Sequence, residues 1–128
     1  MEKPTQYTLT CEVTDDMTAK RIGTAGAKIL STPNMLALME ASAIELCKEY
    51  LDEGMTTVGA EAHVRHLAPT PVGMKVSATA TLRSIERRKM WFDIVVNDEK
   101  GKCGEGSHLR VKVSQKGMAD KAQQKSEG

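Results

Sequence analysis

This 128-residue sequence lacks closely spaced cysteine pairs and long apolar runs. Cysteine occurs three times, at Cys11, Cys47 and Cys103, and no two of these form a CxxC pair. The odd number and wide spacing argue against a disulfide framework or a zinc knuckle and favour a reducing compartment. No apolar run is long enough to span a bilayer, and the start shows no signal-peptide pattern. We therefore expect a soluble, cytoplasmic protein.

An excess of charge of one sign is also lacking. The 18 basic and 17 acidic residues leave a formal net charge of +1. A near-neutral chain has no bulk attraction to nucleic acid or to an anionic membrane, so we expect neither as a partner. The length suits one domain with a real hydrophobic core.

Short segments of alternating polarity predict β-strands along most of the chain. The first is expected at residues 7–13, and the others at 57–67, 72–86, 90–96 and 108–113. Small residues that are expected to face inward would let a helix pack closely on the sheet. These small residues are Ala60, Ala62, Ala78 and Ala80.

The last expected strand and the segment after it are distinguished by their polarity. In this strand Leu109 and Val111 are expected to face inward, and His108 and Arg110 to face solvent. From Gly117 onward the chain is predominantly polar. We predict one domain over residues 1–116 and a disordered polar tail over residues 117–128.

One long helix is predicted over residues 32–51. Thr32 would cap it, and Pro33 suits the first helical position, where a missing N–H costs nothing. Glu40 falls on the apolar side at helical spacing, although an unpaired buried charge costs several kcal/mol. It therefore either finds a buried hydrogen-bond partner or serves a function. The apolar side comprises Leu36, Ala43, Ile44, Cys47 and Leu51, and the polar side Ser42, Glu45, Lys48, Glu49 and Asp52.

A long connection over residues 14–31 precedes this helix, and Gly23 and Gly26 interrupt it. Connections of this length in compact domains are often functional, so we predict a lid or ligand-binding loop. A short helix is expected within it, over residues 16–22.

Three sequence runs carry a resemblance to a known family. They are MTAKRIGTAGAKILSTPNMLALME at 17–40, VGAEAHVRHLAPTPVG at 58–73 and GEGSHLRV at 104–111. With the order strand, helix, four strands, they resemble the fluoroacetyl-CoA thioesterase-like branch of the hotdog thioesterases. The resemblance implies an α+β hotdog fold, in which a five-stranded antiparallel sheet wraps a long central helix. It also implies an acyl-CoA substrate, no cofactor, and a homodimer or dimer of dimers with the site at the subunit boundary.

The resemblance also implies a set of catalytic residues, which here are Thr32, Glu40 and His66. A glycine on the histidine strand, here Gly59, would place its backbone near the thioester carbonyl. Each of these residues also has a simpler explanation from its surroundings, and for Glu40 it is the buried hydrogen-bond partner named above. Thr32 suits a helix cap, His66 a satisfied core position, and Gly59 a bulge or a close-packing position.

The implied chemistry is thioester hydrolysis. Glu40 would act as base or nucleophile, and His66 would orient it or protonate the departing thiolate. Arg87 and Arg88 would either be solvated turn residues or bind the phosphates of coenzyme A. His63 and His66 point to opposite faces of a strand, so we expect no metal site.

The sequence departs from the family in one respect. Members that act on fluoroacetyl-CoA have an aromatic lid before the helix, whereas residues 22–30 contain no aromatic residue. We therefore expect a different short or medium acyl group. The alternatives are a dimer that binds acyl-CoA without hydrolysing it, a hydratase, and a structural dimer. A hydratase would need an Asp and His pair at the helix start, which this sequence lacks.

Overall fold

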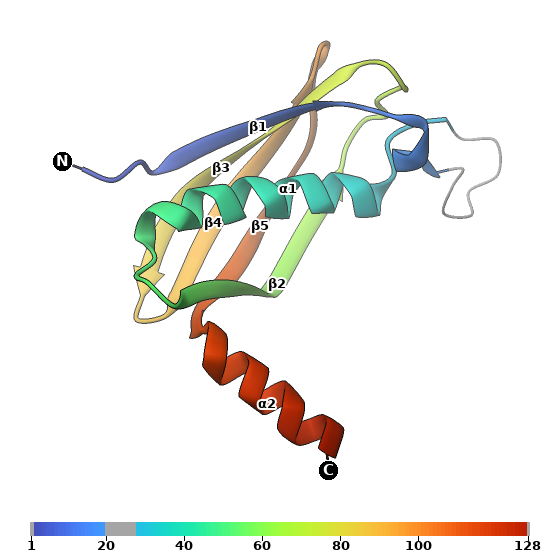
Figure 1. The fold of residues 1–128 in the computed structure, drawn as a ribbon. Coiled ribbons are helices and arrows are strands. Elements are labelled where there is room, and N and C mark those ends of the chain that lie inside the picture. The colour runs from blue at the N-terminus through green and yellow to red at the C-terminus, as the bar shows by residue number, and fades with distance from the viewer. Residues whose placement is uncertain (1, 20–27, 128) are drawn as a thin grey trace.

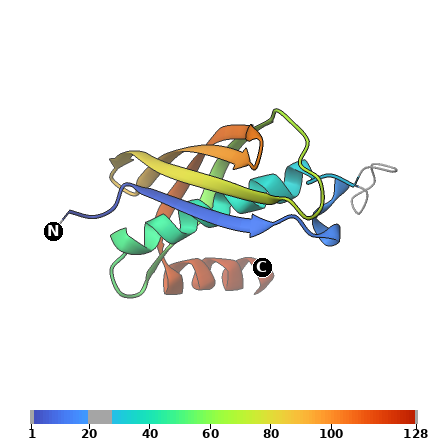
Figure 2. The same cartoon turned by 90° about the horizontal axis from the view of Figure 1, so that it is seen from above.

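The structure, a computed structural model, describes residues 2–19 and 28–127. Five strands form one antiparallel sheet in the order β1–β3–β4–β5–β2, and helix α1 (Thr32–Cys47) lies across one face (Figures 1 and 2). The predicted helix wrapped by a five-stranded sheet is thus confirmed. Within the described ranges, no helix is long and apolar enough to cross a membrane. The strands are Gln6–Glu12 (β1), Met55–His66 (β2), Lys75–Glu86 (β3), Lys89–Asp98 (β4) and Gly101–Ser114 (β5).

The start of α1 differs from the prediction by one residue. Ser31 is the cap, because its Oγ accepts a hydrogen bond from the Asn34 backbone N–H at 3.2 Å. The prediction of Thr32 as the cap is therefore wrong. Because Ser31 caps the helix, the hydroxyl of Thr32 is available to another partner. The helix also ends earlier than expected, at Cys47, where the 3-10 turn η3 (Lys48–Tyr50) follows.

The hydrophobic core lies between α1 and strands β3 and β4. Ser42, predicted on the polar side of the helix, is buried. Its hydroxyl is satisfied there, because it donates a hydrogen bond to the Met39 carbonyl at 2.6 Å. Ala60 and Ala62, predicted to face inward beneath the helix, are both exposed. Ala62 does lie on the inner face, since it pairs with the buried His108, but β2 is an edge strand and leaves it open to solvent. The core includes Met35, Met39, Leu46, Val76, Ala78, Ala80, Met90, Phe92 and Ile94.

The inner face of β5 is opposite to the one predicted. His108 pairs with Phe92 and Arg110 with Met90, and both partners are buried beneath α1. His108 and Arg110 therefore face the helix. Space for this close packing comes from Gly104 and Gly106 on the same face, where an added Cβ would overlap methionine side chains of α1.

An irregularity in β2 determines which of its residues face the helix. The pairing of β2 with β5 shifts between Gly59 and Glu61, so Ala60 is an extra residue at a β-bulge. In a regular strand, residues 59 and 66 would point to opposite faces. The bulge places Gly59 and His66 on the same inner face.

The connection before α1 and the end of the chain also differ from expectation. Where the helix was expected to begin, the structure has the 3-10 turn η1 (Asp15–Met17). Residues 20–27, which include the end of that expected helix and much of the expected lid, lie outside the described residues. The predicted disordered tail is instead helix α2 (Gln115–Glu127), which extends away from the sheet (Figure 1). Alanine, glutamine and lysine favour helix, and Lys116 pairs with Asp120 one turn on at 3.0 Å.

Candidate active site

Thr32 and His66 meet at one end of α1. Thr32 is the first residue of the helix and His66 the last residue of β2, and Thr32 Oγ1 lies 2.8 Å from His66 Nδ1. The hydroxyl can make this bond because Ser31, and not Thr32, caps the helix. An open hollow of about 420 Å³ lies against both side chains, with Ile29, Leu67, Ala68 and Pro69 around it.

Glu40 lies apart from this pair. Eight residues separate it from Thr32 on α1, which is about 12 Å along the axis at ~1.5 Å per residue. Among the described residues, no hydrogen bond or ion pair joins Glu40 to His66. The side chain of Glu40 is 37% exposed, so in the single chain it is partly buried rather than enclosed by apolar side chains. Ile44, one turn on, is 39% exposed, because the sheet does not cover this flank of α1.

Glu40 instead faces Gly59 together with two residues of β5. A Cβ placed on Gly59 would lie 3.3 Å from each of Glu40 Oε2, Arg110 Nη1 and His108 Cε1. Three polar groups from α1 and β5 therefore converge on the backbone of Gly59. Gly59 also begins the bulge. Its place in the sequence can therefore be explained both by the bulge and by its position beside these three polar side chains.

His108 and Arg110 were not predicted as site residues. They were expected on the solvent face because the apolar Leu109 and Val111 alternate with them. The signal that could have found them is the pair of glycines at 104 and 106. These glycines share their face, and a residue without a side chain marks the place where a helix packs closest.

Arg110 is a buried cation held by neutral groups. It is 6% exposed, and its Nε and Nη2 donate to Thr57 Oγ1 and to the Thr57 carbonyl at 2.8 and 3.0 Å. Its Nη1 lies 3.1 Å from His108 Nε2. No carboxylate in the described part of the chain lies within ion-pair distance of the guanidinium. A buried positive charge of this kind can stabilise negative charge that develops beside it.

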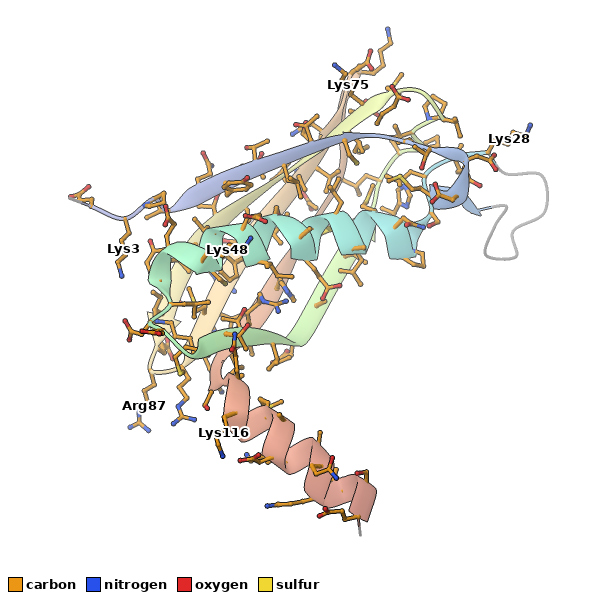
Figure 3. All side chains as sticks on the ribbon, in the orientation of Figure 1. Lys3, Lys28, Lys48, Lys75, Arg87 and Lys116 are labelled. Atoms are coloured by element: carbon orange, nitrogen blue, oxygen red, sulfur yellow. The ribbon has the colours of Figure 1, made fainter. Side chains whose placement is uncertain are left out.

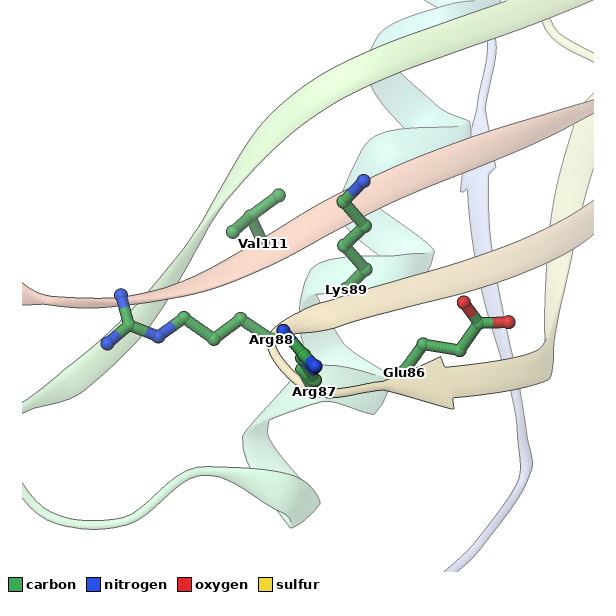
Figure 4. Close-up of a pocket in the computed structure, with 5 residues that line it drawn as sticks. All are labelled: Glu86, Arg87, Arg88, Lys89 and Val111. Carbon is green, nitrogen blue, oxygen red and sulfur yellow. The ribbon is translucent and has the colours of Figure 1, made fainter.

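Arg87 and Arg88 form the two-residue turn between β3 and β4 (Figure 4). With Glu86, Lys89 and Val111 they border a hollow of about 570 Å³. Figure 3 shows the Arg87 side chain pointing away from the sheet at this end of the molecule.

This turn is distant from the Thr32–His66 pair in one chain. On β5, Val111 pairs with Lys89 and Gly104 pairs with His66. The seven residue-to-residue steps from Gly104 to Val111 span about 24 Å at ~3.4 Å each. Over residues 2–19 and 28–127, no group of three or more His, Cys, Asp and Glu side chains could hold a metal ion.

The chain is similar in sequence and in fold to known thioesterases and hotdog proteins. Residues 13–116 match the family described as fluoroacetyl-CoA-specific thioesterase. The fluoroacetyl-CoA thioesterase of Streptantibioticus cattleyicolor is 31% identical over 99 residues, covering 77% of this chain and 71% of that protein. A solved variant of the fluoroacetyl-CoA enzyme FlK, in complex with acetyl-CoA, is 26% identical with a TM-score of 0.89, covering 98% of both chains. A hot-dog-like protein from Thermanaerovibrio acidaminovorans is 26% identical with a TM-score of 0.88, covering 94% and 90% of the two chains. The expected hotdog fold is therefore confirmed.

Proposed function

Since the chain belongs to the fluoroacetyl-CoA-specific thioesterase family, we propose that it hydrolyses the thioester of a short or medium acyl-CoA. The observation that carries this proposal is the hydrogen bond between Thr32 and His66 beside an open hollow. Thioester hydrolysis needs an activated water or nucleophile and donors for the developing oxyanion. In the proposed reaction Glu40 is the base or nucleophile, and His66 protonates the departing thiolate. Thr32 and the Gly59 N–H polarise the carbonyl.

The separation of Glu40 from His66 leads us to place the complete site between two copies of the chain. Leu36 lies midway between Thr32 and Glu40 on α1. If two α1 helices cross antiparallel about Leu36, each Thr32–His66 pair faces the partner's Glu40. The exposed flank at Ile44 and the exposed edge residues 59–63 of β2 support a second copy on this side.

The same antiparallel arrangement gives the arginine turn a role. It brings the partner's β3–β4 turn to the end of the molecule where Thr32 and His66 lie. Arg87 and Arg88 would then bind the phosphates of a coenzyme A whose thioester reaches His66. The neighbouring hollow supports this use, since it could accept part of the bound nucleotide.

The acyl group is proposed from the sequence before α1. Residues 22–30 contain no aromatic residue that could close over a fluoroacetyl group as in the family members specific for it. We therefore propose another short or medium acyl chain. Acetyl-, propionyl-, butyryl-, hexanoyl- and fluoroacetyl-CoA, each followed by release of free thiol, would test this choice.

The catalytic assignment is tested in the same assay with Glu40→Gln and His66→Asn. Each variant should lose at least about a hundredfold in kcat, the effect typical of removing a general acid or base. Unchanged hydrolysis by either variant would show that the assignment is wrong. Binding of acyl-CoA without thiol release by the unmodified protein would favour a sensor over an enzyme.

Mixing these two variants tests the shared site. In a dimer with one Glu40→Gln chain and one His66→Asn chain, a site shared between chains leaves one complete site and one doubly defective site. Differently tagged variants, co-expressed and purified through both tags, should then regain about half of the normal activity. If the mixed dimer stays inactive while the unmodified protein is active, both residues act within one chain.

A further inference from the structure

His108 is a buried titratable residue that the proposed reaction does not use. It is 2% exposed and lies on the face of β5 that packs against α1. Its Nδ1 lies 2.8 Å from the Glu61 carbonyl of β2, and its Nε2 lies 3.1 Å from Arg110 Nη1. Both ring nitrogens are therefore engaged, each with a different kind of partner.

The partners determine the protonation state of the ring. A carbonyl oxygen only accepts hydrogen bonds, so Nδ1 must carry the proton. A guanidinium only donates, so Nε2 must be the unprotonated acceptor. His108 is thus the neutral Nδ1–H tautomer. Its 4.0 Å approach to Glu40 Oε2 is consequently not an ion pair.

We propose that His108 is a positioning residue, whose unprotonated Nε2 holds the Arg110 guanidinium against Gly59 and Glu40. Thr57 anchors Nε and Nη2 of Arg110, whereas within residues 2–19 and 28–127 only His108 anchors Nη1, the guanidinium atom that lies nearest to Gly59. This inference rests on the proposed function, because Gly59 and Glu40 belong to the proposed site. Protonation of His108 would remove the acceptor and place a second positive charge beside Arg110, which would then move.

The surroundings of His108 on each side are consistent with this dependence on pH. Helix α1 contributes Glu40, whose charge favours protonation of the ring, and β5 contributes the Arg110 charge, which opposes it. From β2 the ring meets the Glu61 main chain, and its partner on β4 is the uncharged Phe92. Burial, the largest influence, lowers the pKa of His108, and the Arg110 charge lowers it further.

Two matched variants separate positioning from a structural role. His108→Gln can present an amide oxygen where Nε2 was, whereas His108→Asn can keep the bond to the Glu61 carbonyl but cannot reach Arg110. Each variant loses one of the two hydrogen bonds of His108, so a merely structural role predicts that both variants lose kcat/KM equally. Positioning predicts that Gln keeps kcat/KM within about threefold and that Asn loses about ten- to a hundredfold, the range for a hydrogen bond to a charged group. Equal losses in the two variants, at similar thermal stability, would overturn the proposal.

Nitrogen NMR of the imidazole and a pH profile complete the test. The ring should give the Nδ1–H tautomer at pH 7, and the acid-side fall in kcat/KM should shift in His108→Gln relative to the unmodified protein. An Nε2–H tautomer, a charged ring at pH 7 or an unshifted profile would overturn the proposal. If the unmodified protein hydrolyses no acyl-CoA, the proposed function fails, and the NMR result still decides whether His108 holds Arg110.

Discussion

Replacement of Arg87 by glycine should make the protein more stable and a poorer enzyme at the same time. Arg87 has a φ of 59°, and it is the first residue of the two-residue turn between β3 and β4. Glycine is favoured at this position of a hairpin turn because it has no Cβ to clash with the backbone. An arginine held there at a cost in stability suggests that its charge is used.

The expected gain in stability is a difference between two effects. A side chain in the left-handed region costs about 1–2 kcal/mol, which Arg87→Gly would relieve. Glycine also has more freedom in the unfolded chain, which offsets about 0.5–1 kcal/mol of this gain. The net increase in the free energy of unfolding is about 0.5–1 kcal/mol, or roughly 2–5 °C in Tm for a chain of this size.

The loss of function should appear in KM. One exposed contact between an arginine and a phosphate is comparable with a surface ion pair, so KM for acyl-CoA should rise about two- to fivefold. Added salt should reduce the difference from the unmodified protein, since it screens the exposed charge. Thermal unfolding and thiol release at two salt concentrations measure both effects.

Two control variants separate the backbone from the charge. Arg87→Lys keeps a charge in the same conformation, so it should change Tm little and KM less than glycine does. Arg88→Gly should lower Tm, because Arg88 lacks a positive φ and glycine there only adds freedom to the unfolded chain. A lower Tm for Arg87→Gly would refute the backbone argument, and an unchanged KM would refute the phosphate contact.

Three further predictions concern the inner face of the sheet. Gly59→Ala should fold but lose about tenfold in kcat in the thiol-release assay, because the new Cβ, 3.3 Å from Glu40 Oε2, Arg110 Nη1 and the ring carbon Cε1 of His108, displaces these side chains. Gly106→Ala should destabilise the protein more than Gly104→Ala in urea unfolding, since its Cβ overlaps the backbone of β2 rather than only a flexible methionine. Because burial lowers the pKa of His108, the unfolded chain takes up this proton first as pH falls below about 6.5. Tm should therefore fall more steeply from pH 7 to pH 5 in the unmodified protein than in His108→Gln, and equal slopes would contradict the assignment.

The sheet and the long helix could be predicted because their signals are local. The alternation of Val76, Ala78 and Ala80 with polar residues follows from the period of a strand, and these residues are buried as expected. Strand β3 itself begins at Lys75, and the expected member Val72 is 42% exposed. Element type was therefore easier to predict than element ends, which depend on pairing with distant segments.

The wrong predictions concern features that depend on contacts between segments far apart in the sequence. Polarity alone could not show which face of β5 meets α1, because Leu109 and Val111 are more apolar than His108 and Arg110. Adjacent Ser31 and Thr32 both suit a helix cap by residue type.

The helical positions were harder to assign than the strands for a similar reason. The sheet covers only one flank of α1, so Glu40 is partly exposed although its helical neighbours are apolar. Thr32, Glu40, His66 and Gly59 came from a family resemblance, and their functions remain predictions. Their places within one chain could not be derived from spacing alone.

The bulge in β2 gives the chain one position at which its length can change without harm to the site. Deletion of Ala60 would remove the bulge and leave a regular strand. Gly59 and His66 would then be six positions apart instead of seven, so they would still share a face. Loss of any single residue from 62 to 65 would instead turn His66 toward the opposite side. We therefore expect natural or engineered length variation in this strand to be tolerated at residue 60 and harmful only a few residues later.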